Sequence, residues 1–229
     1  MQGTEPSSVE LAIAPELREA APHLALGVVC AAVQVAEHDE RLQVLIQECI
    51  DGIVQTLDLP KLPDLPEIHE LRKAFRAAGK EPSRYRGSQE SLFRRILQGK
   101  GLFAVNTVVD TNNLVSLESR HSVGTYDVAQ IANPVIFRVG KPGENYQGIG
   151  KDPIDVAGLP VLADRDGPFG SPHRDSARAR ITLSTREIMM VIISFSGLHR
   201  LPESVQRAVD LLCMYCGADT KTIRTAVVE

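Results

Sequence analysis

Residues 105–113 read Val105-Asn106-Thr107-Val108-Val109-Asp110-Thr111-Asn112-Asn113. Apolar side chains recur here in a helical register that continues to Leu117, so the pattern predicts a helix over 106–117. Asp110 and Asn113 would share one face of this helix, because they lie three residues apart. Amides and carboxylates at buried positions need hydrogen-bond partners. The candidates for such a polar cluster are Asn106, Asp110, Asn112 and Asn113.

Two interpretations of this cluster stay open. In the first, its side chains cap helix ends or hold the preceding loop in place. In the second, they line a pocket that hydrogen-bonds a polar ligand. The chain contains no GxxxxGK[ST], HExxH or GxSxG motif, so the common nucleotide, metalloprotease and hydrolase signatures are absent.

The sequence before this helix predicts strands followed by helices. Short runs rich in Val and Leu are typical of buried strands, and apolar residues at helical spacing predict helices. The predicted strands are Val9–Ile13 and His23–Val35, and the helices are Glu40–Leu57, Glu67–Ala78 and one that begins with Ser88 as its N-cap and stops at Gly99. Leu59–Leu65 is predicted to be an extended connection, because proline removes backbone donors and restricts its neighbours.

The sequence after it returns to strands and closes with a helix. The predicted strands are Pro134–Val139, Pro160–Asp164 and Glu187–Phe195, and the helix is Pro202–Cys216. Two stretches rich in glycine and charge, Val139–Asp155 and Asp164–Arg180, are predicted to be long exposed loops, where functional residues often lie.

This order of elements lacks the regular strand–helix alternation of a doubly wound sheet. With 229 residues, 43% of them hydrophobic and 24% charged, the chain can bury one sizeable core. We therefore predict an α+β fold with a mixed sheet and packed helices, in a single compact two-lobed domain over 1–229.

The chain carries no membrane or secretion signal that the sequence alone reveals. No apolar run approaches the roughly 18 residues needed to cross a bilayer, and Met1–Pro6 lacks the basic and apolar parts of a signal peptide. We expect a cytoplasmic protein with no membrane partner.

The four cysteines are too few and too unevenly placed for a disulfide framework. Cys213 and Cys216 form a CxxC in the last predicted helix, where they are expected to be core residues. The alternative is a zinc site, which would need two more ligands, and no second close cysteine pair exists. We expect neither a metal nor a cofactor.

Charge is distributed unevenly, although the net charge is only −4. Residues 1–70 hold 13 acidic and 3 basic side chains, whereas 72–100 hold 9 basic and 2 acidic ones. The basic stretch either contacts a phosphate backbone or is the solvated surface of two amphipathic helices. The candidates for backbone contact are Arg72, Lys73, Arg76, Arg84, Arg86, Arg94, Arg95 and Lys100.

Three motifs in fixed order resemble the B3/B4 domain of the phenylalanyl-tRNA synthetase beta subunit: Ser91–Leu97, then residues 105–113, then Gly124-Thr125-Tyr126-Asp127. In that family a helix precedes an Ile-Asn-Asn-Val-Val-Asp-Val-Thr-Asn-like stretch and a His-Ala-Phe-Asp. The positions that match in place are Asn106, Val108, Val109, Asp110, Asn113 and Asp127. Later segments, 160–167 and 178–186, are also similar, so the resemblance covers 83–198, with the elements of 8–80 packed onto it.

The resemblance implies a pocket in which the synthetase domain hydrolyses tyrosine wrongly attached to tRNA. The carried-over pocket candidates are Asn112 and Asn113. Gly124 stands at the family's histidine position, and the family's pocket glutamate has no clear match in 172–178. In that loop, Arg174 and Arg178 could orient a phosphate or carboxylate, and His173 or Asp175 could position water.

Three functional hypotheses follow. The first is a tRNA-interacting hydrolase, acting on the ester between an amino acid and tRNA. The second is a non-catalytic module whose pocket holds a free amino acid or another small polar ligand, and the third is an interaction protein that uses the acidic N-terminal third. No catalytic or anticodon-binding module of a synthetase is recognisable, so aminoacylation is not expected. The expected partner is aminoacylated tRNA, and DNA is not an expected partner.

Overall fold

Strand β2 (Ala25–Ala32) lies at the centre of the fold because both of its faces are apolar. The computed structural model describes residues 9–150 and 152–229, so Met1–Pro6 lies outside the described residues. Strand β2 pairs antiparallel with β9 (Glu187–Ser194) and with β10 (Arg224–Val228), and β9 pairs with β3 (Ser122–Asp127). The sheet order is therefore β10-β2-β9-β3.

A second sheet covers one face of this central sheet. Its order is β1-β4-β7-β8, formed by β1 (Leu11–Ile13), β4 (Val135–Val139), β7 (Pro160–Asp164) and β8 (Gly167–Gly170). Strands β1 and β4 run parallel and the other pairs antiparallel, so this sheet is mixed. Phe137 and Leu162 from this sheet share a buried cluster with Leu26 of the central one. Strands β5 (Asn145–Gln147) and β6 (Pro153–Asp155) form a separate pair.

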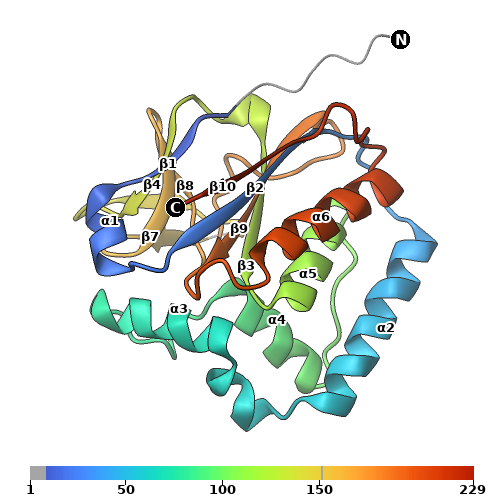
Figure 1. Cartoon of the computed structure of the whole chain (residues 1–229), viewed down its shortest axis with the longest axis horizontal. Coiled ribbons are helices and arrows are strands. Elements are labelled where there is room, and N and C mark those ends of the chain that lie inside the picture. Colours follow the sequence, from blue (N-terminus) through green and yellow to red (C-terminus); the bar gives the residue numbers. More distant parts are fainter. Residues whose placement is uncertain (1–8, 151) are drawn as a thin grey trace.

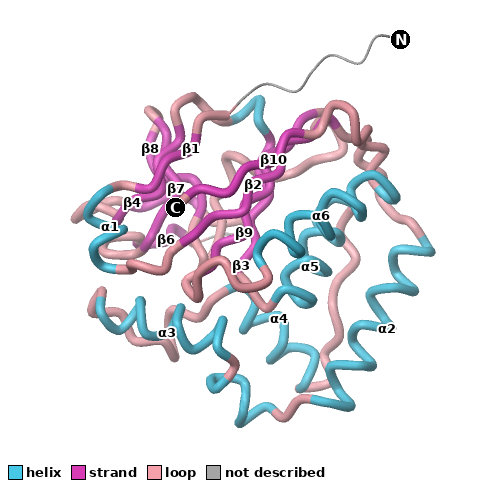
Figure 2. The backbone as a smooth tube through the Cα atoms, in the orientation of Figure 1, coloured by secondary structure: helices cyan, strands magenta, loops and turns pink. Residues whose placement is uncertain are grey.

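Two helices cover the other face of the central sheet (Figures 1 and 2). They are α5 (Thr107–Ser119) and α6 (Leu201–Tyr215). Val29 and Ala31 of β2 point to this side and pack with Leu114 of α5 and Leu211 of α6. Strand β2 is thus buried on both faces, which explains its uninterrupted run of apolar residues.

The remaining helices form a lobe beside α5 (Figure 1). They are α2 (Glu40–Thr56), the 3₁₀ helix η1 (Leu59–Asp64), α3 (Pro66–Ala77) and α4 (Ser88–Leu97). Their apolar side chains meet in a cluster that includes Leu62, Ile68 and Phe93. The short helices α1 (Pro15–Ala20) and η2 (Val128–Gln130) complete the fold. The predicted α+β architecture with a mixed sheet and packed helices is confirmed.

Several local predictions were wrong. Leu59–Leu65 is not extended but forms η1, because the φ that proline fixes also suits a 3₁₀ turn. Helix α4 begins at Ser88, where its start was predicted, but its N-cap residue is Gly87 and not Ser88. The predicted loops contain short strands, β5 and β6 in the first and β8 in the second; Lys151 in the first lies outside the described residues.

All four cysteines are free; of the two that were predicted to be core residues, Cys216 is buried and Cys213 is partly buried. Cys216 is fully buried, and its Sγ lies 3.6 Å from the Thr111 hydroxyl oxygen. Burial raises the pKa of Cys216 to about 11, so its thiol stays protonated at neutral pH. Among residues 9–150 and 152–229, no group of three or more His, Cys, Asp or Glu side chains is arranged to hold a metal ion.

Candidate functional site

A cavity of about 500 Å³ opens beside the first half of α5. Helix α5 and the residue before its N-cap form one wall, β3 forms another, and residues 175–182 form a third. The polar lining residues are Ser88, Asn112, Asn113, Thr125, Tyr126, Asp175, Ser176, Arg180 and Thr182. The apolar ones are Val105, Val109, Val123, Ile149, Ala179 and Ile181. The cavity is therefore amphipathic, as ligand sites commonly are.

Asn106 and Asp110 support this wall from beneath. The side chain of Asn106 caps α5 by accepting a hydrogen bond from the Val109 N–H, at 3.0 Å. The buried Asp110 carboxylate accepts from the Val105 N–H at 3.0 Å and from the Gln43 amide at 2.7 Å. These are the capping and loop-holding roles that the first interpretation of the cluster describes, and neither residue lines the cavity.

Asn112 and Asn113 do face the cavity, from the next turn of α5. The Asn112 carboxamide oxygen accepts from the Thr125 hydroxyl of β3 at 2.9 Å, which fixes its amide nitrogen as a donor. That nitrogen approaches the Asn113 oxygen at 3.5 Å, at the limit for a hydrogen bond. Both carboxamides thus lie in the cavity lining, and whether they bind a ligand there stays a prediction.

Gly124 leaves room for the ring of Tyr126. A Cβ on Gly124 would overlap the Tyr126 phenol, and so would one on Gly170 of β8. The ring also packs edge-on against Phe169, with centroids 5.0 Å apart. The phenol of Tyr126 therefore fills the space that a side chain at position 124 would need.

Tyr126 donates its hydroxyl to Asp175, with an oxygen–oxygen distance of 2.7 Å. The same carboxylate oxygen, Oδ1, accepts a long hydrogen bond of 3.4 Å from the Ser171 N–H. Burial raises the pKa of Asp175 to about 6, although both hydrogen bonds oppose the shift. Burial and the nearby Asp175 raise the pKa of Tyr126 as well, so the phenol stays neutral.

The other loop candidates lie around the cavity rather than in its lining. His173 Nδ1 is 2.7 Å from the carbonyl oxygen of Arg86, and burial lowers the pKa of His173. Arg178 forms a bidentate pair with Asp164, at 2.9 Å for both contacts. Arg174 is exposed. Arg178 is thus paired with a carboxylate of the protein, Asp164, rather than directed at a ligand.

The basic stretch divides into internal and exposed side chains. Buried Glu90 accepts two hydrogen bonds from Arg72 at 2.9 Å and one from Arg94 at 2.7 Å, and the Arg86 Nε lies 4.0 Å away. Arg95 stacks on Phe103, 3.9 Å from the ring centroid. The exposed members of the stretch are Lys73, Arg76, Arg84 and Lys100. Arg86 lies only two residues before Ser88, a lining residue of the cavity.

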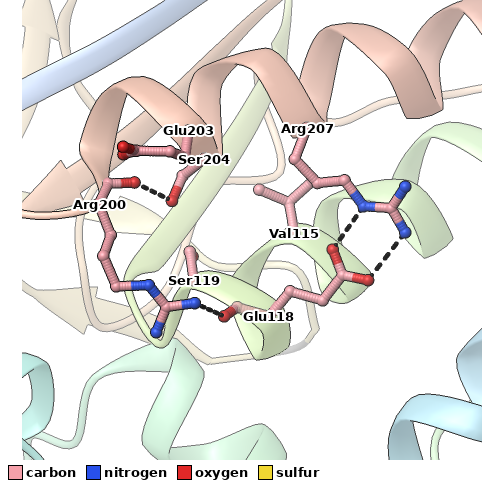
Figure 3. A pocket seen from close by; sticks show the side chains of 7 residues that line it. All are labelled: Val115, Glu118, Ser119, Arg200, Glu203, Ser204 and Arg207. Atoms are coloured by element: carbon pink, nitrogen blue, oxygen red, sulfur yellow. Dashed lines mark hydrogen bonds and ion pairs between the residues drawn. The ribbon is translucent and has the colours of Figure 1, made fainter.

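A second hollow, between α5 and α6, holds about 170 Å³ (Figure 3). Arg207 of α6 donates to both carboxylate oxygens of Glu118, at 2.7 and 2.9 Å. Arg200 reaches toward the Glu118 carbonyl oxygen at 3.5 Å. Because Glu118 and Arg207 neutralise each other, this hollow is a poorer ligand site than the larger cavity.

The sequence did not identify residues 175–182 as one continuous wall of the cavity. Asp175 and Arg178 were considered there, but Ser176, Ala179, Arg180 and Thr182 were not. Nothing in their spacing links them to α5, because they reach the cavity through contacts with distant segments, such as the bridge between Gly148 and Ser176 and the hydrogen bond from the Asp127 N–H to the Ala179 carbonyl. Tyr126 could have been identified from the sequence, because it lies two residues from Gly124, and both residues are in β3.

Fold and site together define an α+β domain that presents one amphipathic cavity between a capped helix and the edge of a sheet. Residues 70–217 match the family model of the B3/4 domain, and the chain belongs to this family. No curated protein matches the sequence.

The fold is similar to an N-terminal fragment of the phenylalanyl-tRNA synthetase beta-subunit from Pyrococcus horikoshii. The TM-score is 0.52 at 13% sequence identity, and the match covers 99% of this chain. It covers 53% of the fragment, so the chain spans about half the length of that structure. The resemblance seen in the sequence motifs is confirmed at the level of family and fold. Within the described ranges, no helix has the length and apolarity to cross a membrane.

Proposed function

We propose that this protein hydrolyses the ester bond of wrongly charged aminoacyl-tRNA, acting in trans. The single observation that carries the proposal is the amphipathic cavity beside α5, where Asn112 and Asn113 present amide donors next to apolar walls. Membership of the B3/4 family supports the choice of tRNA over other esters.

The chemistry needs few protein groups. Water attacks the ester carbonyl carbon, the bond to the ribose oxygen breaks, and the proton lost by the water ends on that oxygen. The negative charge that develops on the carbonyl oxygen is stabilised by N–H donors, a role that the amides of Asn112 and Asn113 can fill. The neighbouring ribose hydroxyl of the tRNA can assist the proton transfer, so a side-chain nucleophile is not required.

An exposed aromatic residue near the cavity supports contact with RNA. Phe103 is 71% exposed, and Arg95 covers one face of its ring. Phe103 lies two residues before Val105, which lines the cavity and is itself 54% exposed. Unpaired bases stack on such aromatic and guanidinium platforms. The unpaired end of a tRNA would meet Phe103 as its aminoacyl group enters the cavity.

The test is release of amino acid from a panel of correctly and wrongly charged tRNAs. The variant is the double substitution Asn112→Ala, Asn113→Ala, and the matched control is Gln55→Ala, which removes an exposed carboxamide from α2. We expect release from at least one wrongly charged tRNA, loss of that release in the double variant, and no change in the control. Absence of release across the panel would sink the proposal.

A second candidate is a module that binds a free amino acid or a similar small polar ligand without turnover. One observation favours it: the residue at the family's histidine position is Gly124, which has no side chain to take part in a reaction. The Tyr126 phenol occupies the space that a side chain at this position would need. Salt separates the two candidates, because binding through phosphate contacts weakens steeply as salt rises and binding of a small ligand does not.

A further inference from the structure

Asp175 is a carboxylate without a cation. Its Oδ1 accepts from Tyr126 and from the Ser171 N–H, whereas its Oδ2 has no hydrogen-bond partner in the described part of the chain. Nor does any Lys, Arg or His there form a salt bridge with it. A half-buried carboxylate that faces a cavity without a cation is unfavourable, because burial removes the water that would stabilise its charge.

Ser176, the residue after Asp175, also has a polar group without a partner in the described part of the chain. Ser176 also lines the cavity and is 2% exposed, yet its hydroxyl has no hydrogen-bond partner among the residues described. Buried hydroxyl groups are normally satisfied. Two neighbouring polar groups on one wall therefore have unused hydrogen-bonding capacity.

Other lining residues supply donors and apolar surface. Asn112 and Asn113 of α5 carry carboxamides, and Arg180, on the same 175–182 wall as Asp175, contributes an exposed cationic side chain. Val109 and Ile181 add apolar side chains to the lining. A ligand that suits this lining has a cation, a carbonyl or carboxylate oxygen, and an apolar group. An α-amino acid or its ester has these three parts.

We infer that Asp175 binds the free ammonium group of the ligand, so that the site accepts α-aminoacyl groups and rejects those with a blocked nitrogen. This inference rests on the proposed function and deepens it by naming the residue that holds the amino group and by requiring that group to be free. Ser176 would accept a second hydrogen bond from the same ammonium. The raised pKa of Asp175, about 6, still leaves the carboxylate ionised at neutral pH, and a bound cation would lower it.

The discriminating variant is Asp175→Asn, which preserves the packing. The Asn oxygen can still accept from the Tyr126 hydroxyl and the Ser171 N–H, while the second oxygen becomes an NH₂ group that repels an ammonium. The matched control is Asp166→Asn, the same change at an exposed position in the turn between β7 and β8.

The probes are the amides of valine, leucine and phenylalanine, together with their N-acetyl derivatives, in calorimetric binding at neutral pH. We expect at least one free amide to bind, N-acetylation to weaken it by roughly ten- to hundredfold, and Asp175→Asn to cause a similar loss. Asp166→Asn should bind like the unchanged protein. Equal binding of free and acetylated amides, unchanged binding by Asp175→Asn, or no binding by any probe would overturn the inference.

This test is separate from the hydrolysis assay. If amides bind through Asp175 but no charged tRNA is cleaved, the ammonium site stands and the hydrolase proposal fails. If charged tRNA is cleaved equally with free and acetylated amino groups, the hydrolase proposal stands and the ammonium site fails.

Discussion

At the scale of single residues, the fold is less stable when Asp175 is ionised than when it is protonated. Burial raises the pKa of Asp175 to about 6, above its value in the unfolded chain. Protonation of Asp175 therefore stabilises the fold fully below the unfolded pKa, and this stabilisation is lost as pH rises through about 6. A shift of this size corresponds to about 3 kcal/mol. The groups that face Asp175 are Tyr126 of β3 and Tyr146 of β5, both neutral because burial raises the pKa of each.

We therefore predict that Asp175→Asn raises the free energy of unfolding at pH 7.5, by up to about 3 kcal/mol, and that the difference shrinks as pH falls toward 4. Urea unfolding at several pH values measures it. A variant that is less stable than the unchanged protein at pH 7.5 would mean that the carboxylate is satisfied within the fold. Binding groups that cost stability are common in functional sites.

His121 predicts the opposite pH dependence. Burial lowers its pKa to about 4, helped by the positive charge of Arg200, and its Nε2 has no partner in the described ranges. A histidine held neutral contributes stability above its unfolded pKa of about 6.5 and loses it as pH falls through about 4.

Between pH 7 and pH 4, the free energy of unfolding should therefore fall less for His121→Leu than for the unchanged protein. The two decreases should differ by up to about 3 kcal/mol. Thermal unfolding across this range measures the difference. Parallel curves for the two proteins would show that His121 does not govern the acid response.

At the scale of elements, the start of α5 depends on one side chain. Asn106 supplies the cap by accepting from the Val109 N–H, and its removal costs about 1 kcal/mol. We predict that Asn106→Ala lowers the melting temperature by about 2–4 °C, and that Asn106→Ser, which keeps a capping oxygen, restores most of it. Equal losses in both variants would show that the side chain is needed for more than the cap.

The elements also show what the sequence could predict. Strand β9 and helix α6 were predicted nearly to their ends, because long apolar runs and helical spacing reflect burial directly. Strands β5, β6 and β8 were missed because three or four residues hold too little periodicity, and β10 because it is an exposed edge. Asn112 and Asn113 came from the motif, whereas the Tyr126–Asp175 contact joins residues 49 apart and has no local signal.

At the scale of the whole molecule, the basic stretch has two separable parts. Arg72 and Arg94 bind buried Glu90 and act within the fold, while Arg84 and Lys100 are exposed. Arg84→Gln with Lys100→Gln should weaken tRNA binding and lower the slope of its salt dependence by about 1–2, with little effect on stability. Filter binding at several salt concentrations measures both. An unchanged slope would place the RNA elsewhere.

The order of synthesis bears on how the central sheet forms. Strand β2 is apolar on both faces, and its partner β9 lies roughly 150 residues further along the chain, which takes about 10–30 s to translate. During that interval on the ribosome, β2 has neither of its neighbours in the sheet. The nascent chain therefore carries an unpaired apolar strand for most of its synthesis, and this strand is exposed to aggregation until β9 emerges.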